Sequence, residues 1–305
     1  MSLRVPMQLR VSEIFYSIQG EGVRVGHPSV FIRVFGCNFR CPGFGMPKGQ
    51  LSTEPDEIAN EVLNNPDKYP TYESLPLART GCDSYPSWHP KLKDYSPELT
   101  LEQIIEKIES VIPEGVRKSQ VDIVFTGGEP LLKCNQLAIN ELLVSNEEYF
   151  KEFNSFTFET NGSQPILSGT MEVIDKLLAR PLIISMSPKL SCSGVPRAKA
   201  IKPNILTEMF EYVVSGFVSN AYLKFVVSPE DIEEQLDEIN DIVSKIKYLI
   251  NEYADVEIPV YLMPEGGTEE RYNTNLKKIS EIAMNKGYVF CPRLHVTLFG
   301  NSWAT

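Results

Sequence analysis

Short runs of β-branched and apolar residues alternate with helix-like segments along most of this chain, and this alternation limits its possible folds most strongly. It is the pattern of βαβ units around a parallel sheet. At 305 residues the chain is long enough for one large domain or two ordinary ones. We therefore predict an α/β fold whose sheet is open or partly closed into a barrel. The predicted strands span residues 29–35, 121–125, 156–159, 182–186, 222–227 and 257–262.

Three segments carry clear helix signals. Thr100, followed three residues later by Gln103, is a capping-box sequence, and an apolar stripe at helical spacing comes after it. Ser228 and Pro229 are typical of the start of a second long helix, and a third is expected to end near Gly287. In sheets of this kind the functional residues collect on the loops that follow the carboxyl ends of the strands.

The charge balance restricts the classes of partner. The chain has 29 Lys and Arg against 40 Asp and Glu, a formal net charge of −11, whereas non-specific binding to nucleic acid needs a basic surface. No apolar run approaches the ~18 residues of a membrane span, and the first residues lack the layout of a secretory signal. We therefore expect no nucleic-acid or membrane partner and a cytoplasmic location. In that reducing compartment, six cysteines are candidates for metal binding or packing rather than for a disulfide framework.

Residues 42–97 interrupt the alternation. They are rich in proline and poor in apolar runs, with one short helix expected at residues 54–63. The segment is too irregular for a domain and too long for an ordinary connection. Such a sequence is typical either of a long surface loop or of a segment that covers a site.

Two cysteines follow the first parallel strand. Cys37 and Cys41 are four residues apart and could face one metal centre, although a buried pair or half of a zinc site would look the same. Cys82 lies among turn-forming residues, where a thiol is a better ligand than in a core. Three thiolates leave one corner of an iron–sulfur cubane, or one zinc position, free. The other three cysteines lack the spacing of metal ligands. Cys134 and Cys291 are expected to be core or surface residues, and the sequence leaves the role of Cys192 open.

Small and polar residues follow three consecutive strands. The loops are Thr126-Gly127-Gly128-Glu129-Pro130, Asn161-Gly162 and Ser187-Pro188-Lys189. Paired glycines let a ligand approach the backbone closely, and Glu129 could offer a carboxylate to a cation or an ammonium group. We expect the three loops to converge on one site.

Two features near the start of the chain favour the same site. Ser17-Ile18-Gln19-Gly20-Glu21-Gly22 is a polar, glycine-punctuated loop, although a simple hairpin turn would look similar. Arg33 is a cation in an apolar strand, and because a buried unpaired charge is costly, it is expected to meet an anion from a substrate or from the protein. The histidines share no metal spacing and are expected to be structural: His27, His89 and His295.

Taken in order, these motifs resemble those of radical S-adenosylmethionine (SAM) enzymes. More narrowly, they resemble the 7-carboxy-7-deazaguanine synthase family of the queuosine and 7-deazapurine pathway. The matching segments are residues 15–22, 31–38, 126–130, 159–162, 187–189, 292–296 and 300–301. The resemblance covers nearly the whole chain apart from residues 42–80, and the ordered set is far more specific than any single motif.

The sequence departs from the superfamily at the third cysteine. Radical SAM enzymes usually show Cys-x3-Cys-x2-Cys, and the third position here is Phe44. Cys82-Asp83-Ser84 resembles the Cys-Asp-Thr of the synthase family, whose cluster loop varies in length. The resemblance therefore implies a single domain over residues 1–305, a partial (β/α) barrel of the radical SAM type, with a proline-rich insertion at 42–81 in the cluster-binding loop.

The resemblance also implies the cofactors and their ligands. Cys37, Cys41 and Cys82 would hold three irons of a 4Fe-4S cluster, and SAM would chelate the fourth. SAM would then be cleaved to a 5′-deoxyadenosyl radical. The cofactor-binding residues would be Gly127, Gly128 and Glu129 at the methionine end, with Ser187, Pro188 and Lys189 along the rest. Ser84, in place of the family's Thr, would ligate Mg²⁺.

The implied reaction is the ring contraction of 6-carboxy-5,6,7,8-tetrahydropterin to 7-carboxy-7-deazaguanine with loss of ammonia, catalysed by a carbon–nitrogen lyase. Arg33 would bind the substrate carboxylate, and Gln19 and Thr126 would also serve the reaction. The substrate-binding set is Ile18, Gln19, Gly20, Arg33, Thr126 and Thr305, the last through the C-terminal carboxylate. The resemblance further implies a reductant such as flavodoxin or ferredoxin and a homodimer.

Two alternatives remain open at this stage. A glycyl-radical-enzyme activase would share the cluster and SAM but act on a protein, and it would have no need of Arg33 or the Gln-Gly-Glu-Gly loop. A binding or regulatory protein that had lost the cluster would explain Phe44 at a cysteine position.

Overall fold

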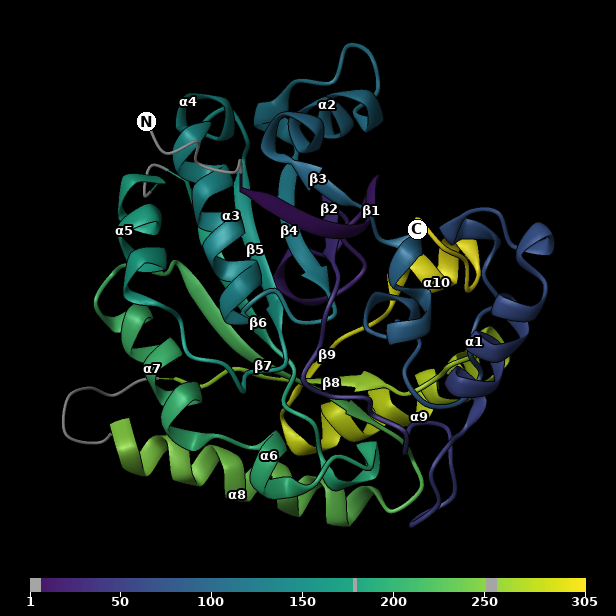
Figure 1. Ribbon diagram of the computed structural model, residues 1–305. Coiled ribbons are helices and arrows are strands. Elements are labelled where there is room, and N and C mark those ends of the chain that lie inside the picture. The colour runs from purple at the N-terminus through teal and green to yellow at the C-terminus, as the bar shows by residue number, and fades with distance from the viewer. Residues whose placement is uncertain (1–6, 178–179, 251–256) are drawn as a thin grey trace.

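A computed structural model describes residues 7–177, 180–250 and 257–305 (Figure 1). Of the predicted single domain, residues 1–6, 178–179 and 251–256 lie outside the described residues. One nine-stranded sheet runs through the molecule in the order β3-β1-β2-β4-β5-β6-β7-β8-β9. From β2 to β9 the strands are parallel, and β1 is antiparallel to both its neighbours. The predicted α/β class with a parallel sheet is confirmed, and the sheet is open, with β3 and β9 at its edges.

The strands are β1 (Gln8–Ile18), β2 (Pro28–Val34), β3 (Glu98–Thr100), β4 (Asp122–Gly127), β5 (Ser155–Thr160), β6 (Leu182–Met186), β7 (Asn220–Val227), β8 (Val260–Pro264) and β9 (Val289–Phe290). The α-helices are α1 (Glu54–Asn64), α2 (Leu101–Val111), α3 (Lys133–Ser145), α4 (Glu147–Phe150), α5 (Ser168–Leu177), α6 (Arg197–Ala200), α7 (Pro203–Val214), α8 (Ile232–Ile250), α9 (Glu269–Lys286) and α10 (Leu294–Phe299). Seven short 3-10 helices lie between them: η1 (Gly22–Arg24), η2 (Pro66–Lys68), η3 (Tyr72–Ser74), η4 (Tyr85–Ser87), η5 (Pro90–Tyr95), η6 (Lys118–Gln120) and η7 (Ser191–Ser193). Among the described residues, no helix is both long and apolar enough to cross a bilayer.

The helix boundaries follow local chemistry. The capping box that begins α2 is present, because Thr100 Oγ1 accepts from Gln103 N and Gln103 Oε1 accepts from Thr100 N. The predicted end of α9 is also confirmed, since Gly287 lies in the left-handed conformation at its C-cap. The predicted start of α8 at Ser228 is wrong. Asp231 has a positive φ of 54°, which a right-handed helix cannot include, so α8 begins only at Ile232.

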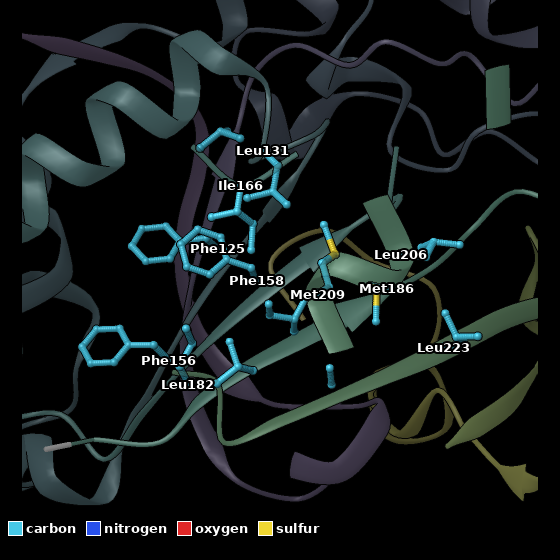
Figure 2. Close-up of a cluster of buried hydrophobic side chains, with 14 of the residues drawn as sticks. Phe125, Leu131, Phe156, Phe158, Ile166, Leu182, Met186, Leu206, Met209 and Leu223 are labelled. Atoms are coloured by element: carbon cyan, nitrogen blue, oxygen red, sulfur yellow. The ribbon is translucent and has the colours of Figure 1, made fainter. Parts of the chain in front are cut away.

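The two faces of the sheet differ in chemistry. On one face, alternate residues of the strands pack under α2, α3, α5, α7, α8 and α9 to form the main core. Figure 2 shows part of this core, in which Phe125 of β4 stacks on Phe158 of β5 with ring centroids 5.1 Å apart. The intervening residues point to the other face, because strand side chains alternate. That second face is where the polar residues of the strands gather.

The proline-rich segment is more ordered than its composition predicts. It contains α1, which matches the helix expected there, and a chain of 3-10 turns. Ten of its residues form a second apolar cluster, separate from the main core: Ile58, Ala59, Val62, Tyr69, Tyr72, Leu75, Ala78, Tyr85, Trp88 and Leu92. In Figure 1 this segment lies beside α10 and the C-terminus.

Candidate active site

One cavity opens at the edge of the sheet where the parallel strands end. Parallel strands place their carboxyl ends at the same edge, so the loops after β2, β4, β5 and β6 meet there. Most of the predicted site residues line it: Gln19, Arg33, Cys37, Cys41, Cys82, Ser84, Thr126, Gly127, Gly128, Ser187, Lys189 and Thr305. Ile18, Gly20, Glu129 and Pro188 belong to the same loops but are not part of the cavity wall.

The three cysteines of the predicted cluster site line this cavity together. Burial raises the pKa of Cys37 to about 12 and that of Cys41 to about 11. Burial also raises the pKa of Cys82, and the nearby Cys41 and Cys37 add to that rise. Three thiolates could share this space only with a positively charged group between them. Cys41 also has a positive φ of 47°, a strained backbone of the kind that collects at functional sites.

A cluster and a single ion require different spacings of their cysteine ligands. Among the described residues, no three His, Cys, Asp or Glu side chains gather closely enough to hold one metal ion. An iron–sulfur cubane binds each cysteine to a different iron, so its ligands stand further apart than those of one zinc ion. Cys134 is exposed on α3 and Cys291 is buried, as expected for residues outside the site, and Cys192 is exposed.

The glycine-rich loop after β4 is joined to the cysteine loop by backbone hydrogen bonds. Gly128 N donates to Val34 O across 3.0 Å, and Glu129 N donates to Gly36 O across 2.7 Å. A Cβ on Gly128 would lie 2.0 Å from Gly36 O, so only glycine permits this approach. The two loops therefore form one rigid wall of the cavity.

Glu129 is held by hydrogen bonds inside the protein. Its carboxylate is fully buried and accepts hydrogen bonds from Leu131 N at 2.9 Å, Thr160 Oγ1 at 2.8 Å and Asn161 N at 2.7 Å. These bonds tie the loop after β4 to the loop after β5. A carboxylate can accept about four hydrogen bonds, so the expectation that Glu129 also offers an oxygen to a cation or an ammonium group stays a prediction.

Arg33 meets the anion that its strand position predicts. Its Nε donates to Glu13 Oε2 of β1 across 2.8 Å, and the Glu13 side chain is 2% exposed. Burial raises the pKa of Glu13, while Arg33 opposes the rise. Only Nε is used by Glu13; Nη1 lies 3.3 Å from Ser84 Oγ and the guanidinium borders the cavity.

Three polar side chains meet inside the cavity. Thr126 Oγ1 of β4 donates to Glu159 Oε2 of β5 across 2.7 Å, and Gln19 Nε2 approaches Glu159 Oε1 at 3.2 Å. The loop that holds Gln19 is the hairpin turn between β1 and β2, since Gln19 N donates to His27 O and Gln19 O accepts from Gly26 N, each across 2.8 Å. Gln19 therefore lies in a hairpin turn and also lines the cavity. On the far wall, Lys189 Nζ donates to Ser187 Oγ across 3.0 Å.

The site residues predicted from the sequence do not include a charged cluster at the cavity wall. Lys224 of β7 is 5% exposed and forms an ion pair with Glu21 Oε2. Burial alone would raise the pKa of Glu21, but Lys224 and Arg293 hold it at about 2. Arg293 also reaches Asp83 Oδ2 at 3.1 Å. Lys224 carries the same signal as Arg33, a cation in an apolar strand, and that signal could have found it.

His295 lines the cavity, whereas the other two histidines have structural contacts. His89 Nε2 lies 3.0 Å from Asp56 Oδ1, and His27 bonds to Arg24. Burial lowers the pKa of His295 to about 4. A Cβ on Gly20 would lie 2.0 Å from its Nδ1, so the glycine makes room for the imidazole. The prediction that all three histidines are structural is therefore incomplete.

The fold and the site together define an α/β enzyme with a three-cysteine cavity at the carboxyl edge of its sheet. Comparison with known proteins places it more narrowly. No protein-family model matches the chain. A 7-carboxy-7-deazaguanine synthase from Aquifex aeolicus is 55% identical over 230 residues, covering 75% of this chain and 74% of the relative. Another, from Halobacterium salinarum, is 28% identical over 303 residues, covering 96% and 91%.

The chain belongs to the 7-carboxy-7-deazaguanine synthase family, and the predicted class of radical SAM enzyme is confirmed. A solved structure, QueE from Escherichia coli, shares the fold, with a TM-score of 0.50, 18% identity and 93% of each chain covered. Family membership implies SAM and a 4Fe-4S cluster as cofactors and a small molecule as substrate.

Proposed function

We propose that this enzyme converts 6-carboxy-5,6,7,8-tetrahydropterin into 7-carboxy-7-deazaguanine and ammonia. Loss of ammonia alone balances substrate against product, so the conversion needs no net oxidant. The observation that carries the proposal is the meeting of Cys82 with Cys37 and Cys41 in one cavity that also holds Arg33 and Thr126. Cys82, separated from Cys41 by the forty residues 42–81, would complete the ligand set.

The cofactors would bind at the two loops nearest the cysteines. Cys37, Cys41 and Cys82 would hold the 4Fe-4S cluster, with SAM at the remaining iron. When bound, the cluster and SAM would supply the radical that removes a hydrogen from the substrate. The Gly127-Gly128 backbone would receive the methionine end of SAM, because it borders the cavity without side chains. Glu129 would fix this loop and help to bind the methionine end of SAM, and Ser187-Pro188-Lys189 would lie along the rest of SAM.

The substrate would bind between the hairpin and β4. Arg33 keeps its Nη donors at the cavity, so it would grip the substrate carboxylate there. Gln19 and Thr126 would orient the ring through their hydrogen bonds with Glu159. Ile18 and Gly20 would shape the hairpin loop behind Gln19.

Ser84 and the C-terminus would complete the substrate site. Ser84 Oγ borders the cavity close to Arg33, where it could bind Mg²⁺ together with substrate oxygens and water. Thr305 lines the same cavity, so it would contact the substrate.

The wider organisation follows the same proposal. The parallel strands from β2 to β9, with helices outside them, would form a partial (β/α) barrel of the radical SAM type. Residues 42–81 would be an insertion in the cluster loop of a single domain, and its Phe44 and Gly81 border the cavity that it would cover. A flavodoxin or ferredoxin would supply electrons to a homodimer. Thiol ligands require a reducing compartment such as the cytosol.

Anaerobic turnover tests the proposal directly. Reconstituted enzyme with about four irons per chain is incubated with SAM, dithionite and the carboxypterin, and products are followed by mass spectrometry. We expect 7-carboxy-7-deazaguanine to form only when both SAM and reductant are present. Cluster-loaded enzyme that cleaves SAM but leaves the pterin intact would overturn the assignment. Neither earlier alternative is favoured: the relatives are synthases rather than activases, and Cys82 would replace a ligand at position 44 because it lines the cavity with Cys37 and Cys41.

A further inference from the structure

The C-terminal tail is held by the proline-rich segment rather than by the sheet. Trp303 packs against the second apolar cluster, which lies more than two hundred residues earlier in the chain. Its indole Nε1 donates to Leu75 O across 2.7 Å. The ring meets Tyr72 edge-on with centroids 5.2 Å apart, and Tyr85 at 6.5 Å. We call Tyr72, Leu75 and Tyr85 the tail seat.

The two rings of the tail seat are held in place by hydrogen bonds of their own. Tyr72 and Tyr85 are 5% and 0% exposed. The Tyr85 hydroxyl donates to Pro76 O across 2.8 Å, and the Tyr72 hydroxyl lies 3.1 Å from Ser87 Oγ. Neither ring can turn away without breaking a buried hydrogen bond, so the seat offers Trp303 a fixed slot.

The residues after Trp303 are directed into the active site. Ala304 packs against Phe15, Phe31 and Val124 on the cavity side of the sheet. It has a positive φ of 60°, which a residue with a Cβ adopts only where its surroundings impose it. Thr305 follows and lines the cavity beside Arg33. The strained turn at Ala304 therefore lies between two fixed points, the tail seat and the stacked rings of Phe15 and Phe31.

We infer that Trp303 is a positioning residue, and that the tail seat exists to hold Thr305 in the wall of the substrate site. This assigns a function to part of the proline-rich segment beyond supplying Cys82: it anchors the tail. The effect on the substrate rests on the proposed function, whereas the anchoring itself does not.

Two measurements test the inference on cluster-loaded enzyme. The first is the rate at which carboxypeptidase Y releases Thr305, followed by mass spectrometry. The second is the split between KM for the carboxypterin and kcat. For Trp303→Ala we expect release of Thr305 at least tenfold faster, and a KM at least tenfold higher with a smaller change in kcat. Phe299→Ala is the matched control, because this neighbouring aromatic is 51% exposed and outside the site; both measurements should remain near wild type.

The outcomes separate the inference from the proposed function. Faster release without any wild-type turnover would support the anchor and refute the proposed reaction. Unchanged release and unchanged KM in Trp303→Ala would overturn the anchor while leaving the reaction intact. A variant that loses its cluster or unfolds is replaced by Trp303→Phe, which keeps the ring packing but not the Nε1 donor. That variant should release Thr305 severalfold faster than wild type, and a wild-type rate would overturn the inference.

Discussion

Thr126 Oγ1 donates a hydrogen bond to Glu159 Oε2 across 2.7 Å, joining β4 to β5 inside the cavity. The same carboxylate also receives Gln19 Nε2 from the hairpin, so Thr126 helps to fix two walls of the site at once. Neither partner of this bond is part of the main core. Its loss should therefore affect function more than stability.

Thr126→Val removes this donor and keeps the shape of the side chain. We expect kcat/KM to fall about tenfold or more, and the free energy of unfolding to fall by about 1 kcal/mol. Steady-state kinetics and urea unfolding measure the two effects. Thr157→Val is the matched control on β5, because the buried Thr157 hydroxyl has no hydrogen-bond partner among the described residues. It should be neutral or stabilising, and an equal loss of activity in both variants would contradict a specific role for Thr126.

Cys82→Ala should abolish the cluster. Two remaining thiols cannot hold the cubane, so we expect iron content to fall to near zero after reconstitution, with loss of the visible absorption of the cluster. Cys134→Ala is the control, since Cys134 is exposed on α3 away from the cavity. It should retain about four irons per chain. Equal loss in both variants would mean that the third ligand is assigned wrongly.

The ion pair between Glu13 and Arg33 should be important for stability as well as for the site. Glu13→Gln leaves the partly buried guanidinium of Arg33, 18% exposed, without its counter-ion, and removing one partner of a buried pair costs about 3 kcal/mol. The control is Glu98→Gln, because Glu98 pairs with Arg10 at a side-chain exposure of 51%, where the loss should stay below about 1 kcal/mol. Urea unfolding compares the two. Similar small losses would show that solvent reaches and screens Arg33.

Much of this site can be predicted from sequence, because strand side chains alternate and parallel strands end at one edge. The runs that became β2, β4, β5 and β6 were sufficient to bring their terminal loops together. The hydrogen bonds of Glu129 inside the protein could not be predicted this way. Its motif indicates a carboxylate near a ligand, but only the tertiary fold brings Thr160 and Asn161 close enough to donate to it.

The proline-rich segment shows a second limit. From its irregular pattern only one helix could be predicted and not the apolar cluster, because the apolar residues pack across short turns without a helical or strand period. The contact of Trp303 with Leu75 joins residues that no local pattern relates. Lys224 is different: the same reasoning that singled out Arg33 applies to it, so it could have been predicted.

Stability should fall as the solution is acidified from about pH 6.5 to 4. The pKa of His295 is lowered from 6.5 to about 4 in the folded protein, mainly by burial. Over that range the unfolded chain binds a proton that the folded protein refuses, so protonation favours unfolding. The loss from this one group amounts to up to about 3 kcal/mol. This loss of stability should be complete near pH 4, and it should be absent above pH 7.

Urea unfolding of the cluster-free protein at a series of pH values measures this loss, because the cluster itself does not survive acid. His295→Gln keeps a polar side chain beside Gly20 and has no titrating proton. Its unfolding free energy should decline less steeply than that of wild type between pH 6.5 and 4.5. The matched control is His27→Gln, on the exposed side of the hairpin, which should follow the wild-type curve. If His295→Gln also follows that curve, the imidazole is protonated as readily in the folded protein as in the unfolded chain, and solvent must reach it beside Gly20.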